Sequence, residues 1–386
     1  MEPSGGGELM AQLELVLDRN MFLSALFKAQ GVVDRKSTGN VLSNLLLETI
    51  SDERVTLTGT DFDVILRAEL NANVKSGGTA CINGKSLFDV VKNISEPEIH
   101  FKLLDNHWVE ITSGRSRFRL AGINAVDYPE IAKPDNLSWV TIPRALLKDC
   151  IEKTAFSVSN DETRMNLNGV FLRIQPADNG HARVIMVSTD GHRLSKVEAE
   201  TELGGYEQQS FSAIVHKKGV QELKRLLDDE VEGIGVGFAP GHIVFSTGST
   251  AFTVRQIEDA YPDYERVIPT SAPNKVTMSR QRIAEVIKRI AILTSNKTYI
   301  VKMELESGKI AFTSSTPDYG EGRDEIDVDY EGDSMTIGYN YSYLLDVFQS
   351  LRGDEIVYRF FTATEQAQLG SLGIAERPDA FMRRWT

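Results

Sequence analysis

The chain has 386 residues, of which 41% are hydrophobic and 25% charged, and its formal net charge is −13. At roughly 150 residues per domain, this length accommodates two or three domains that each bury their own core. No apolar run reaches the ~18 residues that span a bilayer. The first ten residues lack the basic and apolar regions that are typical of a signal peptide. We therefore expect a cytoplasmic protein with a flexible extension over residues 1–10.

One helical pattern occurs three times along the chain. The three predicted helices, at 18–30, 143–155 and 279–291, place Arg19, Arg144 and Arg280 at equivalent positions. These positions are separated by roughly 130 residues, a spacing far longer than the 20–50-residue period of solenoid repeats. Each helix is followed by an apolar strand and then by a Thr-Asp or Thr-Pro-Asp turn. The strands are Val41–Leu47, Leu167–Ile174 and Tyr299–Leu305, and the turns begin at Thr60, Thr189 and Thr316. A repeat of this length indicates three similar whole domains.

The remaining elements have the same organisation in each repeat. Short antiparallel strands are predicted at Val55–Thr60, Val64–Leu70, Ile99–Leu104, Trp108–Thr112 and Phe118–Leu120. A second helix is predicted at Gly84–Ile94, Lys217–Asp228 and Asn340–Leu351. These patterns predict an α+β fold with helices on one face of antiparallel sheets, in domains at 11–137, 138–270 and 271–386. Cys81 and Cys150 fall in different predicted domains, which disfavours a disulfide.

The net negative charge argues against a nucleic-acid partner, but the local distribution of basic residues argues for one. In the predicted helix Lys217–Asp228, four basic residues share an arc of roughly 120° and the apolar residues occupy the opposite arc. A similar, less clean separation occurs at 279–293, whereas acidic residues concentrate in loops such as Asp324–Asp333. One basic helix face is usually only solvated. Its recurrence in corresponding helices favours a ring with an acidic exterior and a basic lining that binds a polyanion.

Motifs for catalysis are scarce. Gly84-Lys85-Ser86 ends like a Walker A loop, but five residues instead of four separate Gly78 from Gly84, and the segment opens an amphipathic helix. Asp190 and His192 have the residue types of an acid/base pair. Thr-Asp-Gly also forms tight turns in which the Asp caps backbone amides, and the recurrence of Thr-Asp at residue 60 favours that structural interpretation. We expect no catalytic residue, no metal site and no cofactor.

Several longer motifs resemble one known family. Thr189–Leu194, Asp161–Gly169 and Tyr261–Pro269 are similar to segments of the bacterial β sliding clamps, the processivity subunit of DNA polymerase III. The likeness runs in order from about residue 12 to residue 361. It implies three copies of one α+β domain per chain and a head-to-tail homodimer that closes into a ring. Helices would line the hole around double-stranded DNA, and no reaction is implied.

The resemblance also implies which residues meet DNA and the partner subunit. Lysine and arginine side chains on or near the lining helices would attract phosphates without reading sequence. These are Lys28, Lys36, Lys85, Lys148, Lys217, Lys218, Lys224, Arg225 and Lys288. At the ring joint, Phe118 and Leu120 would meet Ile292 and Leu293 of the partner.

A peptide-binding pocket is implied between the second and third domains. The matching positions are Arg164, Leu167, Thr189, Gly191, His192, Arg193, Leu194, Pro262, Arg266, Val267, Asn340, Tyr343 and Met382. The replicative polymerase, the clamp loader and repair proteins would dock short segments containing Gln and Leu or Phe there. The alternative is that these apolar residues serve ordinary interdomain packing.

The sequence departs from the family at two places. Gly39-Asn40 stands where the family usually carries Leu-Pro or Met-Pro, and the chain ends in Met382–Thr386 where relatives commonly end in Met-Pro-Met-Arg and an apolar residue. Two arginines beside the pocket leave open a specialised second clamp with altered partner binding. Two further alternatives are a DNA-processing enzyme that uses Asp190 and His192, and a structural homodimer without DNA. The basic helix faces disfavour the last.

Overall fold

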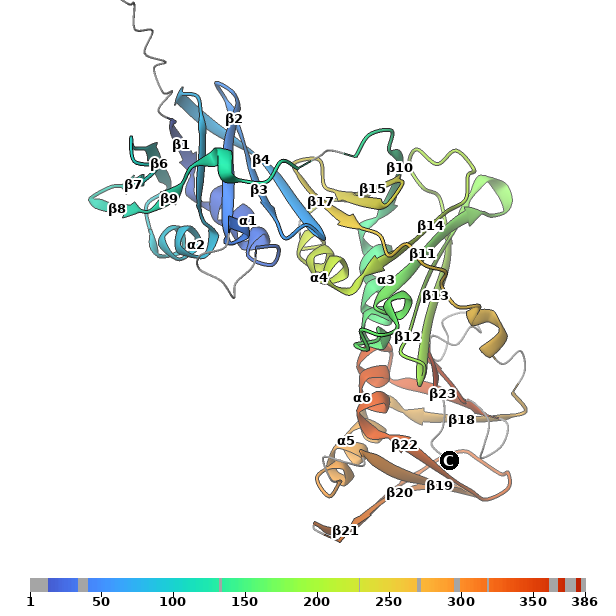
Figure 1. Ribbon diagram of the computed structural model, residues 1–386. Coiled ribbons are helices and arrows are strands. Elements are labelled where there is room, and N and C mark those ends of the chain that lie inside the picture. The colour runs from blue at the N-terminus through green and yellow to red at the C-terminus, as the bar shows by residue number, and fades with distance from the viewer. Residues whose placement is uncertain are drawn as a thin grey trace, which may run out of the picture. The chain divides into compact units, whose positions relative to one another are not determined.

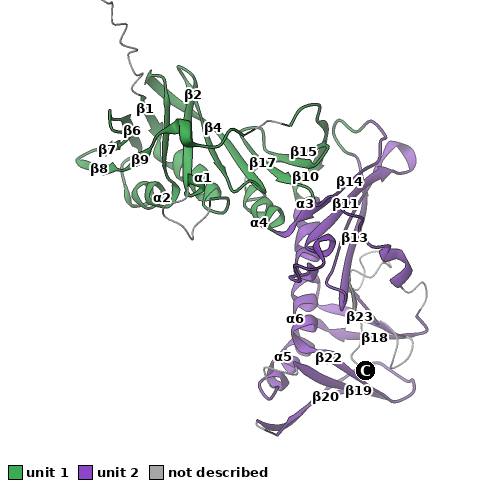
Figure 2. Ribbon diagram, viewed as in Figure 1, with its two compact units in different colours: residues 1–145, 203–206, 218–256 green, residues 146–202, 207–217, 257–386 purple. Residues whose placement is uncertain are grey.

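The structure is a computed structural model that describes residues 13–33, 41–131, 134–228, 230–268, 272–294, 299–317, 319–360, 367–371 and 380–382. The chain folds into two compact units, which Figure 2 colours separately. Unit 1 contains residues 1–145, 203–206 and 218–256, and unit 2 contains 146–202, 207–217 and 257–386. The middle of the chain contributes strands to both units, because its two groups of strands pair with different sheets.

Unit 1 is built on one large antiparallel sheet. Its described strands number 13, and the main path is β10-β15-β16-β17-β4-β1-β6-β7-β8, with β2, β3, β5 and β9 branching from it (Figure 1). Their bounds are β1 (Glu14–Asp18), β2 (Asn44–Ser51), β3 (Arg54–Thr60), β4 (Val64–Ser76), β5 (Thr79–Asn83), β6 (Glu98–Leu103), β7 (Val109–Ser113), β8 (Ser116–Leu120), β9 (Gly122–Ile123), β10 (Ser138–Pro143), β15 (Gly233–Ala239), β16 (His242–Ser246) and β17 (Thr250–Arg255). The helices of this unit are α1 (Arg19–Ala29), α2 (Gly84–Asn93) and nearly all of α4 (Lys217–Leu226).

Unit 2 contains two antiparallel sheets among its described residues. One has the order β14-β11-β12-β13-β25-β24-β23-β18 and the other β21-β20-β19-β22. Their bounds are β11 (Gly169–Pro176), β12 (Ala182–Thr189), β13 (Arg193–Thr201), β14 (Phe211–His216), β18 (Asn274–Ser279), β19 (Ile300–Glu306), β20 (Lys309–Thr316), β21 (Gly320–Asp327), β22 (Met335–Asn340), β23 (Glu355–Phe360), β24 (Ala367–Ser371) and β25 (Ala380–Met382). Its helices are α5 (Arg280–Ala291), α6 (Tyr341–Ser350) and nearly all of α3 (Arg144–Thr154).

The six predicted helices are confirmed, each to within a residue or two at its ends. In α5, Ile283, Val286, Ile287 and Ile290 are buried, which is the spacing that places one apolar stripe against a core. The helix begins where the Ser279 side chain accepts a hydrogen bond from the Arg282 amide. The Gly84-Lys85-Ser86 segment opens α2 beneath an Asn83 cap, as its helical interpretation predicted.

An arginine at the start of one helix closes the end of the other helix in every repeat. The guanidinium groups of Arg19, Arg144 and Arg280 donate to the carbonyls of Lys92, Leu227 and Phe348 at 2.8, 3.0 and 3.1 Å, respectively. Their backbone amides donate to the carbonyls of Pro97, Glu232 and Asp354. The last carbonyls of a helix have no partner within the helix, and a cation there also opposes the negative end of the helix dipole. The predicted threefold repeat is therefore visible in the hydrogen bonds themselves.

The structure also shows the state of the two cysteines and the character of the helices. Cys81 and Cys150 are buried free thiols, and burial raises the pKa of each to about 12. Among the described residues, no helix combines the length and apolar character needed to cross a membrane.

The helix-closing contact gives a first prediction. Arg280→Ala leaves the carbonyl oxygens of Phe348 and Gly353 without their side-chain donor, so we expect thermal unfolding of unit 2 to show a loss of about 1–3 kcal/mol. The matched control is Arg282→Ala on the same helix, where the side chain is exposed and the change should stay within about 0.5 kcal/mol. Equal losses in the two variants would contradict the role given to Arg280.

Candidate peptide-binding site, basic helices and edge strands

A tight turn between β12 and β13 places five of the predicted pocket residues. Thr189 Oγ1 accepts from the Gly191 amide and donates to the Arg193 carbonyl at 2.7 Å. The Asp190 carboxylate accepts from the backbone amides of His192 and Arg193 at 2.9 and 3.0 Å. Gly191 has a φ of 89°, a conformation that favours glycine. The carboxylate of Asp190 therefore holds the turn, which is the structural interpretation of Thr-Asp.

The same turn occurs in the first repeat. The Asp61 carboxylate accepts from the Val64 amide at 2.9 Å, and Thr60 Oγ1 accepts from the amide of Phe62, which has a φ of 73°. A bulky residue in this conformation is strained, so the backbone shape is imposed by the turn itself. The second copy differs in its Gly191-His192-Arg193 sequence, which is where the family resemblance places binding.

Arg193 is the most constrained of these residues, with an exposed fraction of 9%. Its guanidinium donates to Asp190, to the Asp346 carboxylate at 2.7 Å and to the Phe156 carbonyl at 2.7 Å. It also lies 4.3 Å from the centroid of the Tyr343 ring. Each of its three nitrogens thus donates to an acceptor inside unit 2. This arrangement joins β13 to α6 and makes Arg193 a residue that shapes the site.

The polar residues around this joint are more accessible. Arg164 is exposed; its Nε donates to Asp161 at 2.9 Å and its Nη2 to the Asp190 carbonyl at 3.0 Å. The His192 ring is exposed and lies 6.2 Å from the Tyr343 ring, centroid to centroid. Burial, and after it the nearby Asp190 carboxylate, raises the pKa of the Tyr343 hydroxyl. Asn340 caps α6 by accepting from the Ser342 amide at 2.9 Å, so it fixes the helix that carries Tyr343.

The apolar members of the predicted pocket divide into buried and exposed residues. Leu167 and Leu194 are buried, and Leu194 packs in a cluster with Phe171, Val187 and Tyr264. Tyr264 begins a short 3₁₀ helix, Tyr264–Val267, in which Val267 is 45% exposed and Arg266 pairs with Asp263 at 2.8 Å. Pro262, two residues earlier, is also exposed. The site thus has a buried apolar floor with exposed Pro262 and Val267 nearby.

The C-terminal strand borders the same turn. In β25, Met382 lies opposite Arg193 and Phe381 opposite Leu194 in an antiparallel pairing with β13. The side chain of Met382 and residues 383–386, including the two arginines of the tail, lie outside the described residues. The sequence did not identify Phe156 or Asp346 as partners of Arg193; Asp346 is far away in the chain, and no local signal marks it.

The basic residues predicted to face DNA differ widely in exposure. Lys28 is buried, with an exposed fraction of 7%, which argues against a contact with phosphates. Lys218 pairs with Asp61, and Arg225 pairs with the buried Glu222 at 2.6 Å. These ion pairs neutralise half of the basic arc predicted on α4. The signal for one of them was present, because Glu222 lies three residues before Arg225 on a helix.

The other predicted DNA-binding residues remain at the surface. Lys224 and Lys288 are exposed and form no ion pair with a described residue, and Lys148 is half-buried. Lys85 pairs with Asp89 at 3.0 Å in an exposed i,i+4 pair, and Lys217 donates to Asn160 at 3.3 Å. Exposed pairs of this kind are weak and screened by salt. Lys36 lies outside the described residues.

The four residues predicted at the ring joint lie on or beside two strands at sheet edges. β8 ends the sheet of unit 1 and carries Phe118, which is 37% exposed, and the half-buried Leu120. β21 ends a sheet of unit 2, and Leu293 packs beside it, because a Cβ added at Gly322 would lie 2.6 Å from Leu293. Ile292 is 74% exposed. Both edges therefore carry accessible apolar groups.

Arg193 gives the second prediction. Arg193→Met removes the buried guanidinium and its three hydrogen bonds, and it leaves the carboxylates of Asp190 and Asp346 without their cationic partner. We therefore expect the free energy of unfolding to fall by at least about 2 kcal/mol. Arg164→Ala, in the exposed arginine that touches the same turn, should cost less than about 1 kcal/mol. Thermal unfolding of both variants measures this, and a smaller loss for Arg193→Met than for Arg164→Ala would refute the assignment.

Comparisons with known proteins identify the same family in all three segments of the chain. Family models of the DNA polymerase III beta subunit match three successive segments: the N-terminal domain matches residues 13–132, the central domain 141–263 and the C-terminal domain 265–373. The beta sliding clamp of Pseudomonas putida is 31% identical over 346 residues, covering 89% of this chain and 92% of that protein. The beta sliding clamp of Caulobacter vibrioides is 31% identical over 351 residues, covering 90% and 93%.

Solved structures give the same result. The DNA polymerase sliding clamp of Caulobacter crescentus matches with a TM-score of 0.87 and 29% identity, covering 97% of this chain and 100% of that chain. The sliding clamp of Bartonella birtlesii bound to griselimycin matches with a TM-score of 0.88 and 27% identity, covering 97% and 100%. The chain therefore belongs to the DNA polymerase III beta subunit family, the sliding clamps that serve as non-catalytic processivity subunits of this polymerase.

Proposed function

We propose that the chain acts as a head-to-tail homodimer that closes around double-stranded DNA and tethers the replicative polymerase in the cytoplasm. The single observation that carries this proposal is the family match through all three segments of the chain. Each chain contributes three domains, at 11–137, 138–270 and 271–386. The family is non-catalytic, so the alternative of a DNA-processing enzyme is not retained.

The two edge strands support the ring joint. β8 carries Arg117 and Arg119, which share the one carboxylate of Glu110, and Arg115 precedes the strand, so a positive surplus remains. β21 carries a surplus of carboxylates, at Glu321, Asp324, Glu325 and Asp327, with Arg323 as its one basic side chain. An unpaired edge strand is a template for another chain, and opposite charges set which edges meet. Pairing β8 of one protomer with β21 of its partner, twice about a two-fold axis, closes a ring and covers Phe118 and Ile292.

DNA binding in this proposal depends on a smaller set of residues than the sequence suggested. The exposed Lys224 and Lys288 provide the strongest candidates, because their ammonium groups have no carboxylate partner among the described residues. Lys85, Lys148 and Lys217 add weaker attraction, whereas Lys218 and Arg225 are already paired. Few and exposed phosphate contacts suit a ring that holds DNA and still slides.

Partner proteins dock at the turn of Thr189–Leu194 in unit 2. Leu194 and Val267 offer apolar contacts, and Arg164 and His192 offer polar ones, while Arg193 holds the floor in place. The binding of griselimycin by the Bartonella relative supports a ligand site on this fold. The polymerase, the clamp loader and repair proteins would present short segments with Gln and Leu or Phe. The tail beside β25 keeps open a specialised second clamp with altered partner preference.

The ring joint gives the third prediction. Ile292→Ala together with Leu293→Ala removes apolar groups from both joints, at roughly 2–5 kcal/mol per large side chain where these are buried. Light scattering at micromolar concentration should then detect monomers, whereas the wild type is dimeric. Val126→Ala serves as control, because Val126 is 86% exposed in unit 1 and lies on neither edge strand. A double variant that remains dimeric would place the joint elsewhere.

Topological binding gives the fourth prediction. Protein placed on circular DNA by a clamp loader should stay bound and should leave once the circle is cut, because the ring slides off free ends. Lys224→Glu with Lys288→Glu should lower direct DNA affinity and flatten its salt dependence. Lys275→Glu with Lys302→Glu, at two exposed lysines on β18 and β19, is the control for net charge. Equal retention on circles and on cut DNA would reject an encircling ring.

A further inference from the structure

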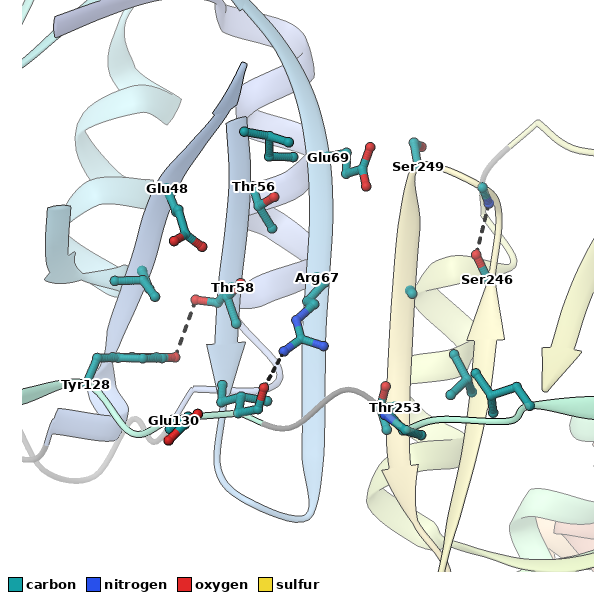
Figure 3. A pocket seen from close by; sticks show the side chains of 18 of the residues that line it. Glu48, Thr56, Thr58, Arg67, Glu69, Tyr128, Glu130, Ser246, Ser249 and Thr253 are labelled. Atoms are coloured by element: carbon teal, nitrogen blue, oxygen red, sulfur yellow. Dashed lines mark hydrogen bonds between the residues drawn. The ribbon is translucent and has the colours of Figure 1, made fainter. Parts of the chain in front are cut away.

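We infer that a cavity on the sheet of unit 1 is a second docking groove, which takes an extended partner segment carrying a basic and an apolar side chain. The cavity measures about 760 Å³ and lies where β4 pairs with β17 (Figure 3). It is separate from the turn at Thr189–Leu194 in unit 2. A volume of this size is typical of ligand pockets in proteins.

The strand register defines the floor of the cavity. On β4, Val64, Leu66 and Ala68 are buried in the core, so Arg67 and Glu69 project from the opposite face. The strands pair so that five residues that line the cavity form one continuous row: Leu46, Thr58, Arg67, Ala251 and Ser246. Four strand spacings of about 4.8 Å give a length of about 19 Å, which accommodates about six residues of an extended peptide. The floor is thus a groove that crosses the strands.

The walls come from the segment that follows β9. Tyr128 donates its hydroxyl hydrogen to the Thr58 carbonyl at 3.4 Å, and Figure 3 shows this contact beside Glu130. Tyr261 makes the same bond to the Val187 carbonyl at 3.3 Å, so this junction repeats the one beside the unit 2 site. Trp139, 44% exposed, lies over Gly237, where an added Cβ would be 3.2 Å from the indole. The glycine lets the ring lie flat as an apolar platform.

Arg67 provides hydrogen-bond donors in the middle of the groove. Its Nη2 donates to the Ile131 carbonyl at 2.7 Å, which is its one acceptor among the described residues (Figure 3). A guanidinium has five N–H donors. Burial lowers the pKa of Arg67, and the Glu48 carboxylate opposes that shift. A partly desolvated guanidinium with open donors suits a main-chain carbonyl of an extended peptide.

Charge selects the side chains of the occupant. Glu48 and Glu130 line the cavity, are exposed and form no ion pair with a described residue, whereas Glu69 is paired with Arg54 at 3.4 Å. Glu48 offsets Arg67, which leaves a negative surplus that favours lysine or arginine over an acidic residue. At the unit 2 site, by contrast, Arg164 and Arg266 are each paired with a neighbouring aspartate.

The test uses the full chain labelled with ¹⁵N at tryptophan. The indole signal of Trp139 is assigned through its loss in Trp139→Phe, and Trp108 reports non-specific binding. The probe is an acetylated and amidated heptapeptide, Ala-Lys-Ala-Leu-Ala-Lys-Leu. We expect titration to shift the Trp139 signal and not that of Trp108, and the peptide with Glu in place of both Lys should bind at least about tenfold more weakly.

Substitutions in the cavity identify the side chains that bind the peptide and set its charge preference. Arg67→Gln should weaken the basic peptide about tenfold, because the charge-assisted hydrogen bond is lost. Glu48→Gln with Glu130→Gln should abolish the preference for Lys over Glu, and Glu96→Gln, an exposed residue outside the cavity lining, should retain it. An unchanged Trp139 signal, equal binding of both peptides or retained preference in the double variant would each overturn the inference. None of these readouts depends on DNA loading, so they separate this proposal from the clamp function.

Discussion

In every repeat, the arginine that begins the first helix binds the carbonyl end of the second helix. Arg19, Arg144 and Arg280 each have this role. A charged donor supplies strong hydrogen bonds to carbonyls that the helix itself cannot satisfy. In the first and third repeats, α1 packs against α2 and α5 against α6, and the contact helps to hold each pair. The position of Lys288, on α5, depends on that pairing.

Sheet pairing between repeats then creates the candidate sites. β4 pairs with β17 in unit 1, and the groove around Arg67 crosses that junction. β13 pairs with β25 in unit 2, beside the turn that carries His192 and Arg193. Both junctions use a Tyr-Pro-acid segment, Tyr128–Glu130 and Tyr261–Asp263, whose tyrosine donates a hydrogen bond to a carbonyl of the third strand of the repeat, β3 or β12. One architecture thus gives two sites, with a polar floor in the first and an apolar floor in the second.

Sequence predicted the parts of the fold that depend on local pattern. The six helices followed from apolar spacing and from the repeated pattern, and the Thr-Asp turns followed from their recurrence. Contacts between distant residues were not predictable in this way. The bond between Arg193 and Asp346 depends on how β13 and α6 pack, and the burial of Lys28 depends on tertiary packing of α1. The basic arc on α4 was overestimated, because Asp61, which neutralises Lys218, lies in another repeat.

The most direct test of the clamp function is the length of DNA made by the replicative polymerase on a primed single-stranded circle with its clamp loader. With this protein present, we predict products that extend around the circle in single binding events, since a topological link prevents dissociation. The Ile292→Ala and Leu293→Ala double variant should give short products, because an open joint cannot keep the ring closed. Product lengths that are the same with and without the protein would contradict the account.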